Sequence, residues 1–213
     1  MLPFSNSTPP RIVVFDVGGV LIDWDPENLY RQLIPDDAAR AHFLTHVTPR
    51  IWNAHQDLGL HSWADAVAQR IALYPDHADL IRAYDTRWPD MVAGAIEGTV
   101  TLKKQLRAAG VPVYAITNYS TEKWALSQEL YPFLREFDGV IVSAHEKMVK
   151  PDPAIYRLLC QRYGLDAAEC IFIDDLKANI DAAKAVGMHG HVFTSPDNLR
   201  ETLETQLNIK LGA

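Results

Sequence analysis

Short, largely apolar runs recur along the chain, separated by polar residues and glycines. The first, at residues 12–15, is wholly apolar and consists of β-branched and aromatic side chains. Four more runs lie at residues 111–116, 139–142, 170–173 and 190–193. Apolar runs of this length are typical of strands buried in a parallel sheet that is covered on both faces.

The segments between these runs carry the start and stop signals of helices. Gly110 stands just past the end of one segment, where helix C-termini favour glycine, and Asp152-Pro153 and Ser195-Pro196 open two others. We expect helices at residues 99–109, 121–130, 153–163, 177–186 and 196–207. Strands that alternate with helices predict an α/β fold, a doubly wound parallel sheet with right-handed crossovers.

Residues 35–95 show no period-two alternation, so we expect no strand there. They show helical patterns broken by proline at residues 36–47, 49–57, 62–73 and 76–88, after a helix that begins at Pro26 and ends near residue 34. This shift predicts a helical insert after the first strand. The expected division is a loose N-terminal tail at 1–10, an α/β core at 11–23 and 96–213, and a helical insert at 24–95.

Charge and composition narrow the possible partners. The net charge is −7 and there is no basic block, which disfavours binding to nucleic acid or to a membrane surface. Cys160 and Cys170 make no disulfide framework and fit a reducing compartment. No apolar stretch is long enough to span a membrane, and residues 1–10 lack the features of a signal peptide. We therefore expect a cytoplasmic protein, while its oligomeric state stays open.

Polar residues follow four of the predicted strands. They are Asp16, Thr117-Asn118, Ser143 and Asp174-Asp175. Because the carboxyl ends of parallel strands lie along one edge of a sheet, we expect these groups to converge there, where open α/β sheets bind ligands. After Asp16, two glycines allow a sharp turn that brings backbone N–H groups close to a bound group.

Asp16 and the Asp174-Asp175 pair would place several carboxylates in one cleft. At close range such groups stay partly protonated unless a cation neutralises them. Oxygen ligands suit a hard cation such as Mg²⁺, which binds one or two carboxylates and keeps waters and phosphate oxygens as its other ligands. The sequence has no His and Cys cluster with zinc spacing. It therefore predicts a Mg²⁺ site.

The remaining polar groups suit a phosphoryl group. Thr117 offers a hydroxyl, Asn118 a backbone N–H, and Lys150 a positive charge on a loop that Pro151 stiffens. Together with the cation they would form an electropositive cup. Asp16 is then the natural nucleophile, because an aspartate can form an acyl-phosphate intermediate.

Four motifs, taken in their order along the chain, resemble those of the haloacid dehalogenase-like (HAD) superfamily. They are FDVGGVL at residues 15–21, ITN at 116–118, KP at 150–151 and FIDDLKAN at 172–179. The resemblance spans residues 11–193, and the helical insert sits where subfamily I members carry a C1 cap. It implies that Asp16 is the nucleophile and a Mg²⁺ ligand. The Gly18 carbonyl and the Asp175 side chain would be further metal ligands, with Asp174 in support. The phosphate-binding residues that it implies are Val17, Gly18, Thr117, Asn118 and the catalytic Lys150.

One position departs from the superfamily pattern. Most of its phosphatases carry a second aspartate two residues after the nucleophile as general acid and base, and here that residue is Gly18. Loss of a general acid costs on the order of 10²–10⁴ in rate. Members similar to glucose-1-phosphate phosphatases also carry this glycine, so the glycine does not exclude activity, and this resemblance implies a small phosphorylated metabolite, such as a sugar phosphate, as substrate. The glycine itself favours a substrate with a good leaving group, or an acid supplied by the cap or by water. Asp23, His55 and Asp57 are candidate replacement acids, although solvation or helix capping is the simpler explanation for each.

The leading hypothesis is a Mg²⁺-dependent phosphomonoester hydrolase that acts on a small-molecule phosphate ester. One alternative is a 2-haloacid dehalogenase, which would use Asp16 in an ester intermediate and needs no acid at Gly18. Dehalogenases of this superfamily need no metal, however, and usually lack the double acid of the fourth motif. The other alternative is a binding or regulatory protein that kept the fold and lost turnover.

Overall fold

The structure is a computed structural model that describes residues 9–212. Its main sheet has the strand order β5-β4-β1-β6-β7, and every pairing in it is parallel. The strands are β1 (Ile12–Phe15), β4 (Val113–Thr117), β5 (Gly139–Val142), β6 (Cys170–Asp174) and β7 (His189–Val192). The α/β prediction is confirmed, with a strand at each predicted run. The tail expected at 1–10 lies outside the described residues except for Pro9 and Pro10.

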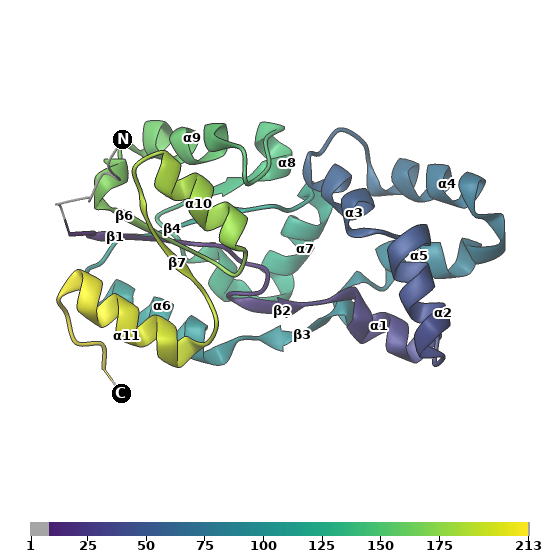
Figure 1. The fold of residues 1–213 in the computed structure, drawn as a ribbon, viewed down its shortest axis with the longest axis horizontal. Helices are drawn as coiled ribbons and strands as arrows, with labels where there is room; N and C mark the ends of the chain where they lie inside the picture. The colour runs from purple at the N-terminus through teal and green to yellow at the C-terminus, as the bar shows by residue number, and fades with distance from the viewer. Residues whose placement is uncertain (1–8, 213) are drawn as a thin grey trace.

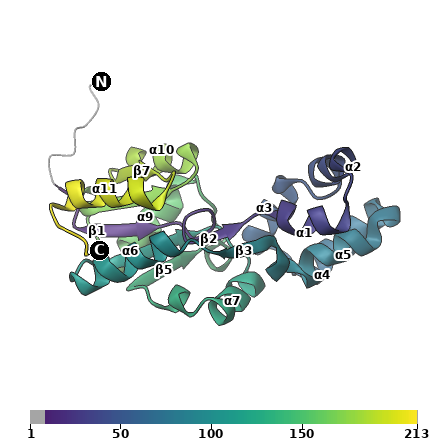
Figure 2. The same ribbon diagram turned by 90° about the horizontal axis from the view of Figure 1, so that it is seen from below.

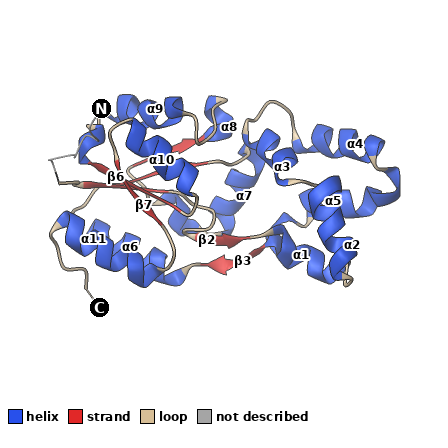
Figure 3. Ribbon diagram, in the orientation of Figure 1, coloured by secondary structure: helices blue, strands red, loops and turns tan. Residues whose placement is uncertain are grey.

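Strand β1 is the middle strand of the sheet, and helices cover both faces of the sheet (Figures 1 and 3). Val13 and Phe15 belong to one apolar cluster, and Ile12 and Val14 to the cluster on the opposite face. The first cluster includes residues of α6 (Glu97–Ala108), α7 (Thr121–Leu130) and α11 (Pro196–Leu207), and the second includes residues of α9 (Pro153–Tyr163) and α10 (Lys177–Ala185). The alternation of strand side chains thus builds two layers around a buried sheet.

Two further strands form an antiparallel ribbon, β2 (Ile22–Trp24) and β3 (Val92–Ala95). The expectation of no strand between residues 35 and 95 is therefore wrong at β3. This strand has the sequence Val-Ala-Gly-Ala and none of its residues is fully buried, so it shows no apolar alternation. Pairing with β2 forms it, with Asp23 opposite Gly94, and such pairing leaves no periodic signal in the sequence.

The chain between the two ribbon strands folds into helices, and we call these residues, 25–91, the cap. Figures 1 and 2 show the cap beyond the end of the main sheet, joined to it through the ribbon. Its helices are α1 (Pro26–Leu33), α2 (Asp37–His42), α3 (Arg50–Asp57), α4 (Trp63–Leu73) and α5 (Ala78–Thr86). A π-helical turn, Phe43–Val47, continues α2, and short 3₁₀ turns flank α5 at Pro75–His77 and Trp88–Met91.

Aromatic side chains form the core of the cap. Tyr84 packs against Trp52 and Trp63 with ring centroids 5.1 and 5.7 Å away, and Tyr30 packs against Phe43 at 4.8 Å. This cluster is continuous with the apolar cluster on one face of the main sheet. Cap and sheet therefore pack through shared apolar contacts. No helix among the described residues is long and apolar enough to cross a membrane.

Candidate active site

Asp16 directly follows β1, at the carboxyl edge of the sheet. Its neighbours on both sides are fixed, because β1 pairs with β4 and β6 and the Asp16 N–H donates to the carbonyl of Ile173 at 2.8 Å. The N–H of Val17 donates to Asp16 Oδ1 at 2.6 Å. The carboxylate is thus oriented by backbone on the central strand, and only 8% of the residue is exposed.

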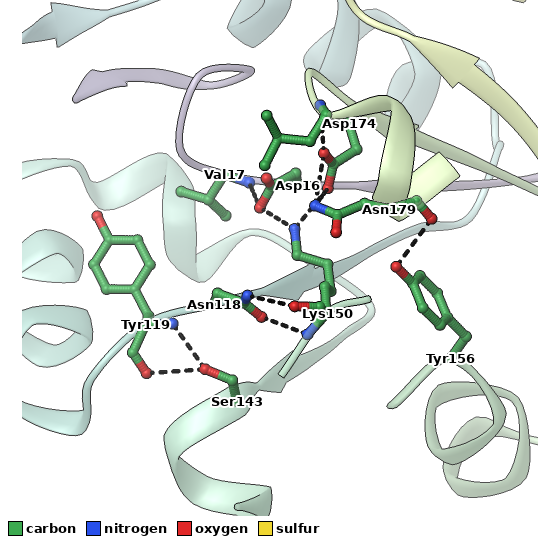
Figure 4. A network of polar contacts seen from close by, with 10 residues as sticks. Asp16, Val17, Asn118, Tyr119, Ser143, Lys150, Tyr156, Asp174 and Asn179 are labelled. Carbon is green, nitrogen blue, oxygen red and sulfur yellow. Dashed lines mark hydrogen bonds and ion pairs between the residues drawn. The ribbon is translucent and has the colours of Figure 1, made fainter. Parts of the chain in front are cut away.

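Lys150 joins two of the carboxylates (Figure 4). Its Nζ lies 2.7 Å from Asp16 Oδ1 and 2.7 Å from Asp174 Oδ2, and 1% of its side chain is exposed. The loop that carries it is held by Asn118, which accepts from the Lys150 N–H at 2.8 Å and donates to the Lys150 carbonyl at 3.1 Å. The peptide bond from Lys150 to Pro151 is cis. Asn118 therefore holds the lysine loop with its side chain, a contact that the sequence did not reveal.

Asn179 is a site residue to which the sequence analysis gave no role. Its Nδ2 lies 2.9 Å from both carboxylate oxygens of Asp174, and the N–H of Leu176 donates to Asp174 Oδ1 at 2.8 Å. Asn179 is itself held by α9, because Tyr156 donates from its hydroxyl to the Asn179 carbonyl at 3.0 Å. The sequence did offer a signal for this role. Asn179 lies five residues after Asp174, in the first turn of α10, so its side chain can face back toward the end of β6.

Asp16, Asp174 and Asp175 form a group that could hold a metal ion, with one oxygen from each lying within 4.8 Å of the others. Gly19 makes room for this group, because a Cβ built on it would lie 2.8 Å from Asp175 Oδ2. One lysine faces three carboxylates, so the site has excess negative charge. The donors are all oxygen, and this set fits a hard divalent cation such as Mg²⁺.

The charges of the site shift its pKa values. Burial raises the pKa of Asp16 to about 7; Lys150 opposes this increase and repulsion from Asp174 adds to it. Burial also raises the pKa of Asp175, again with a contribution from Asp174. The attraction of Asp16 and Asp174 raises the pKa of Lys150 in spite of its burial, which keeps it charged. A bound cation would therefore favour the ionised form of both aspartates.

Thr117 lies at the end of β4 and is 1% exposed. Its hydroxyl finds no hydrogen-bond partner among residues 9–212. A buried hydroxyl without a partner costs free energy, so this atom is available to a bound ligand. Ser143, also expected at this edge, instead joins cap and core: its hydroxyl donates to the Asp57 carbonyl at 2.6 Å and accepts from the Tyr119 N–H at 2.9 Å.

A cavity of about 100 Å³ lies between the cap and this edge of the sheet. Aromatic rings make up much of its wall, with amide, hydroxyl, carboxyl and ammonium groups between them. The lining residues are Gly18, Trp24, Asn53, Asp57, Trp63, Trp88, Asn118, Tyr119, Ser120 and Lys123. Gly18 and Asn118 connect this cavity to the predicted phosphate site. The sequence did not indicate that the cavity wall would include Trp24, Tyr119, Ser120 and Lys123, because these residues come together only where the cap packs against the core.

Hydrogen bonds hold the cap over the cavity. Trp63 donates from Nε1 to the Ser120 hydroxyl at 2.7 Å, and Lys123 donates from Nζ to the Asp85 carbonyl at 2.9 Å. Lys123 also forms an ion pair with the Asp85 carboxylate. The structure thus represents a closed arrangement of cap and core.

A model of the haloacid dehalogenase-like hydrolase family matches residues 10–187. The chain belongs to this family. It is a hydrolase, and several of its relatives are phosphatases. The sesquiterpene phosphatase astK of Aspergillus oryzae is 27% identical and the match covers 91% of this chain and 94% of that protein. The validoxylamine A 7'-phosphate phosphatase of Streptomyces hygroscopicus is 24% identical over 94% of this chain and 93% of that protein.

Solved structures of HAD family members share the fold. An HAD family enzyme from Bacteroides thetaiotaomicron, solved with magnesium and inorganic phosphate, superposes with a TM-score of 0.62 at 20% identity, covering 87% of this chain and 95% of that one. An HAD-like hydrolase from Porphyromonas gingivalis reaches a TM-score of 0.73 at 19% identity, covering 95% of this chain and 100% of that one. These similarities confirm the architecture of sheet and flanking helices.

Proposed function

We propose that this HAD hydrolase is a Mg²⁺-dependent phosphomonoester phosphatase that forms an aspartyl-phosphate on Asp16. The observation that supports this most is the buried lysine between two carboxylates, with a third carboxylate beside them. A site with excess negative charge can accept a phosphate dianion only together with a cation. The double acid Asp174-Asp175 also separates this chain from the metal-independent dehalogenases.

In the proposed reaction, Asp16 attacks phosphorus through a carboxylate oxygen, and the bond from phosphorus to the leaving oxygen breaks. Asp16, the Gly18 carbonyl, Asp174 and Asp175 would hold Mg²⁺, which when bound neutralises phosphate charge. Lys150 orients Asp16 through its 2.7 Å contact and adds positive charge. The Thr117 hydroxyl and the N–H groups of the loops at Val17, Gly18 and Asn118 donate to the phosphate oxygens. Water then hydrolyses the intermediate and frees Asp16.

The cap supplies the pocket for the leaving group in this proposal. Its aromatic walls and scattered polar groups suit a small ring that bears hydroxyl groups, so sugar phosphates and related small phosphorylated metabolites are the substrates we propose. The cavity of about 100 Å³ favours a small leaving group over a nucleotide or a polymer. A cytoplasmic location and a small-molecule partner, without nucleic acid or membrane, remain part of the proposal.

Hydrolysis of p-nitrophenyl phosphate tests the function. We expect turnover that requires Mg²⁺, stops in excess chelator, and falls at least about 10³-fold in Asp16→Asn, which keeps the shape of the side chain without its charge. Asp76→Asn, an exposed cap substitution, is the matched control and should keep wild-type turnover. Activity that persists in chelator or in Asp16→Asn contradicts the proposal. Chloride release from 2-chloropropionate without metal would support the dehalogenase alternative instead.

A further inference from the structure

The cavity has no carboxyl group where most HAD phosphatases carry their acid, because that residue is Gly18. The three candidates from the sequence now lie in very different places. Asp23 is exposed on β2, and His55 is exposed on α3. Asp57, the last residue of α3, lines the cavity together with Gly18 and Asn118. Of the three, only Asp57 shares a cavity with the predicted phosphate site.

The backbone of Asp57 is fixed to the core. Its carbonyl accepts from the Ser143 hydroxyl at 2.6 Å, and two residues later the Gly59 carbonyl accepts from the Lys147 ammonium. Gly59 has a φ of +62°, and a Cβ there would lie 2.6 Å from the Ala144 carbonyl oxygen. A residue with a side chain could not make this close approach. The cap chain is therefore held against α8 (Ser143–Glu146) at the position that presents Asp57.

The side chain of Asp57 is directed by Asn53, whose Nδ2 donates to Asp57 Oδ2 at 3.2 Å from one turn earlier in α3. Burial raises the pKa of Asp57 to about 7, against the opposing effects of Lys150 and the Ser120 N–H. The other charged or titratable groups around it are Lys123 in the cavity wall and the buried tyrosines Tyr84 and Tyr119, whose pKa values the Asp57 charge helps to raise. Both protonation states of Asp57 are thus accessible near neutral pH, as an acid that must later act as a base requires.

We propose that Asp57, supplied by the cap, is the general acid and base of this enzyme in place of the residue missing at Gly18. This inference rests on the proposed phosphatase function. In the first step Asp16 bonds to phosphorus, the bond to the leaving oxygen breaks, and that oxygen takes the Asp57 proton to leave as an alcohol. In the second step the Asp57 carboxylate takes a proton from water. The water oxygen bonds to phosphorus, the bond to Asp16 breaks, and phosphate, the Asp16 carboxylate and protonated Asp57 result.

The arrangement links catalysis to cap closure. The Asp57 carbonyl contacts the core through Ser143, so the acid is in place only when the cap is closed over the cavity. In the closed state, a substrate that fits under the cap has both the nucleophile Asp16 and the acid Asp57 beside it. When the cap is open, Asp16 is accessible but no acid is in place.

Substituting Asp57 gives a signature that depends on the leaving group. Asp57→Asn should lower kcat about 10²-fold to 10⁴-fold on an alkyl phosphate, whose leaving oxygen needs a proton. With p-nitrophenyl phosphate, whose leaving group departs without a proton, the first step should stay near the wild-type rate while the second slows. We therefore expect a burst of one equivalent of p-nitrophenol and a phosphorylated enzyme that intact-mass spectrometry detects. A merely structural defect would also slow the first step with p-nitrophenyl phosphate, so it would give no burst and accumulate no intermediate.

Asp57→Glu, Asp23→Asn and His55→Ala complete the test. Asp57→Glu keeps a carboxyl group and should recover part of the alkyl phosphate activity, and the other two should match the wild type on both substrates. Asp57→Asn that shows neither a burst of p-nitrophenol nor a phosphorylated enzyme, or that keeps wild-type activity on the alkyl phosphate, would overturn this inference while leaving the phosphatase proposal intact. Turnover by Asp16→Asn would overturn the phosphatase proposal itself, which keeps the two failures distinct.

Discussion

Gly19 occupies a position where both backbone conformation and space require glycine. Its φ is +73°, and a Cβ would lie 2.8 Å from Asp175 Oδ2. We predict that Gly19→Ala displaces Asp175 and raises the Mg²⁺ concentration needed for half-maximal activity by at least about tenfold, the effect of losing about 1.4 kcal/mol of binding. A magnesium titration of p-nitrophenyl phosphate hydrolysis measures it.

Gly110→Ala is the matched control for Gly19→Ala. Gly110 has a similar φ of +77°, but a Cβ there meets nothing within 4 Å. Both variants should lose about 1 kcal/mol of unfolding free energy from the backbone strain, and only Gly19→Ala should change the magnesium requirement. An unchanged requirement in Gly19→Ala would show that Asp175 does not bind the ion.

At the scale of single residues, the sequence predicted the group that lies on the main sheet. Asp16 follows β1, and Thr117 and Asp174 are the last residues of β4 and β6. Because these parallel strands end at one edge of the sheet, topology alone brings the three residues together. Asn179 and Lys123 were missed because helix packing and cap position decide what they face. The catalytic roles themselves remain predictions that the substitutions above test.

Helix α6 carries a buried charge that the fold must stabilise. Lys103 is 1% exposed, and its Nζ donates to the Phe133 carbonyl at 2.5 Å and lies 4.1 Å from the centre of the Phe137 ring. Burial nevertheless lowers the pKa of Lys103 to about 8, only partly opposed by Glu136. The folded protein therefore binds this proton more weakly than the unfolded chain does.

That shift predicts a pH-dependent stability. Between pH 8 and 10.5 the unfolded chain holds the Lys103 proton and the folded protein releases it, so this group increases the unfolding free energy as the pH rises through that window. Lys103→Met should stabilise the protein at pH 7 by about 1 to 2 kcal/mol, less than the full shift because a hydrogen bond is lost. The gain should vanish above about pH 10.

Urea unfolding at pH 7 and pH 10 measures the effect of Lys103→Met. The control is Lys104→Met, the next residue, which is exposed on the same helix and should leave stability within about 0.5 kcal/mol of the wild type at both pH values. A Lys103→Met variant that is less stable than the wild type at pH 7 would mean that the hydrogen bond to Phe133 outweighs the cost of burying the charge.

At the scale of helices and strands, a clear capping signal or apolar run predicted the element that the structure has, whereas elements without such a signal were missed. The helix predicted at residues 121–130 is α7 without a change of boundary, because Ser120 caps it and Pro132 follows its end. The ribbon strand β3 was missed because its small residues carry no pattern. The short helix α8 was missed for a similar reason: a single turn of four residues gives no measurable period.

On the scale of the whole molecule, polar contacts join the cap to the core, and the ion pair of Lys123 and Asp85 is one of them. We predict that Asp85→Ala favours the open cap, because it removes an attraction present only in the closed form. KM should rise about threefold to tenfold, while the unfolding free energy should change by less than about 1 kcal/mol because the pair is partly exposed.

Steady-state kinetics and thermal unfolding test Asp85→Ala. Asp79→Ala is the control, since it removes an ion pair with Arg82 that lies within α5 and does not reach the core. If both variants raise KM equally, the effect arises from the charge of α5, and the pair across the closure does not control the cap.

The β2-β3 ribbon has one more consequence. Asp23 pairs with Gly94, so the chain leaves for the helical insert and returns from it on neighbouring strands. The chain therefore leaves the core and returns to it at almost the same point, after 70 intervening residues. Such a junction allows one insert to be exchanged for another of different length and lining. The carboxylates at the strand ends would stay in place, whereas the acid would have to come with each new insert, as Asp57 does here.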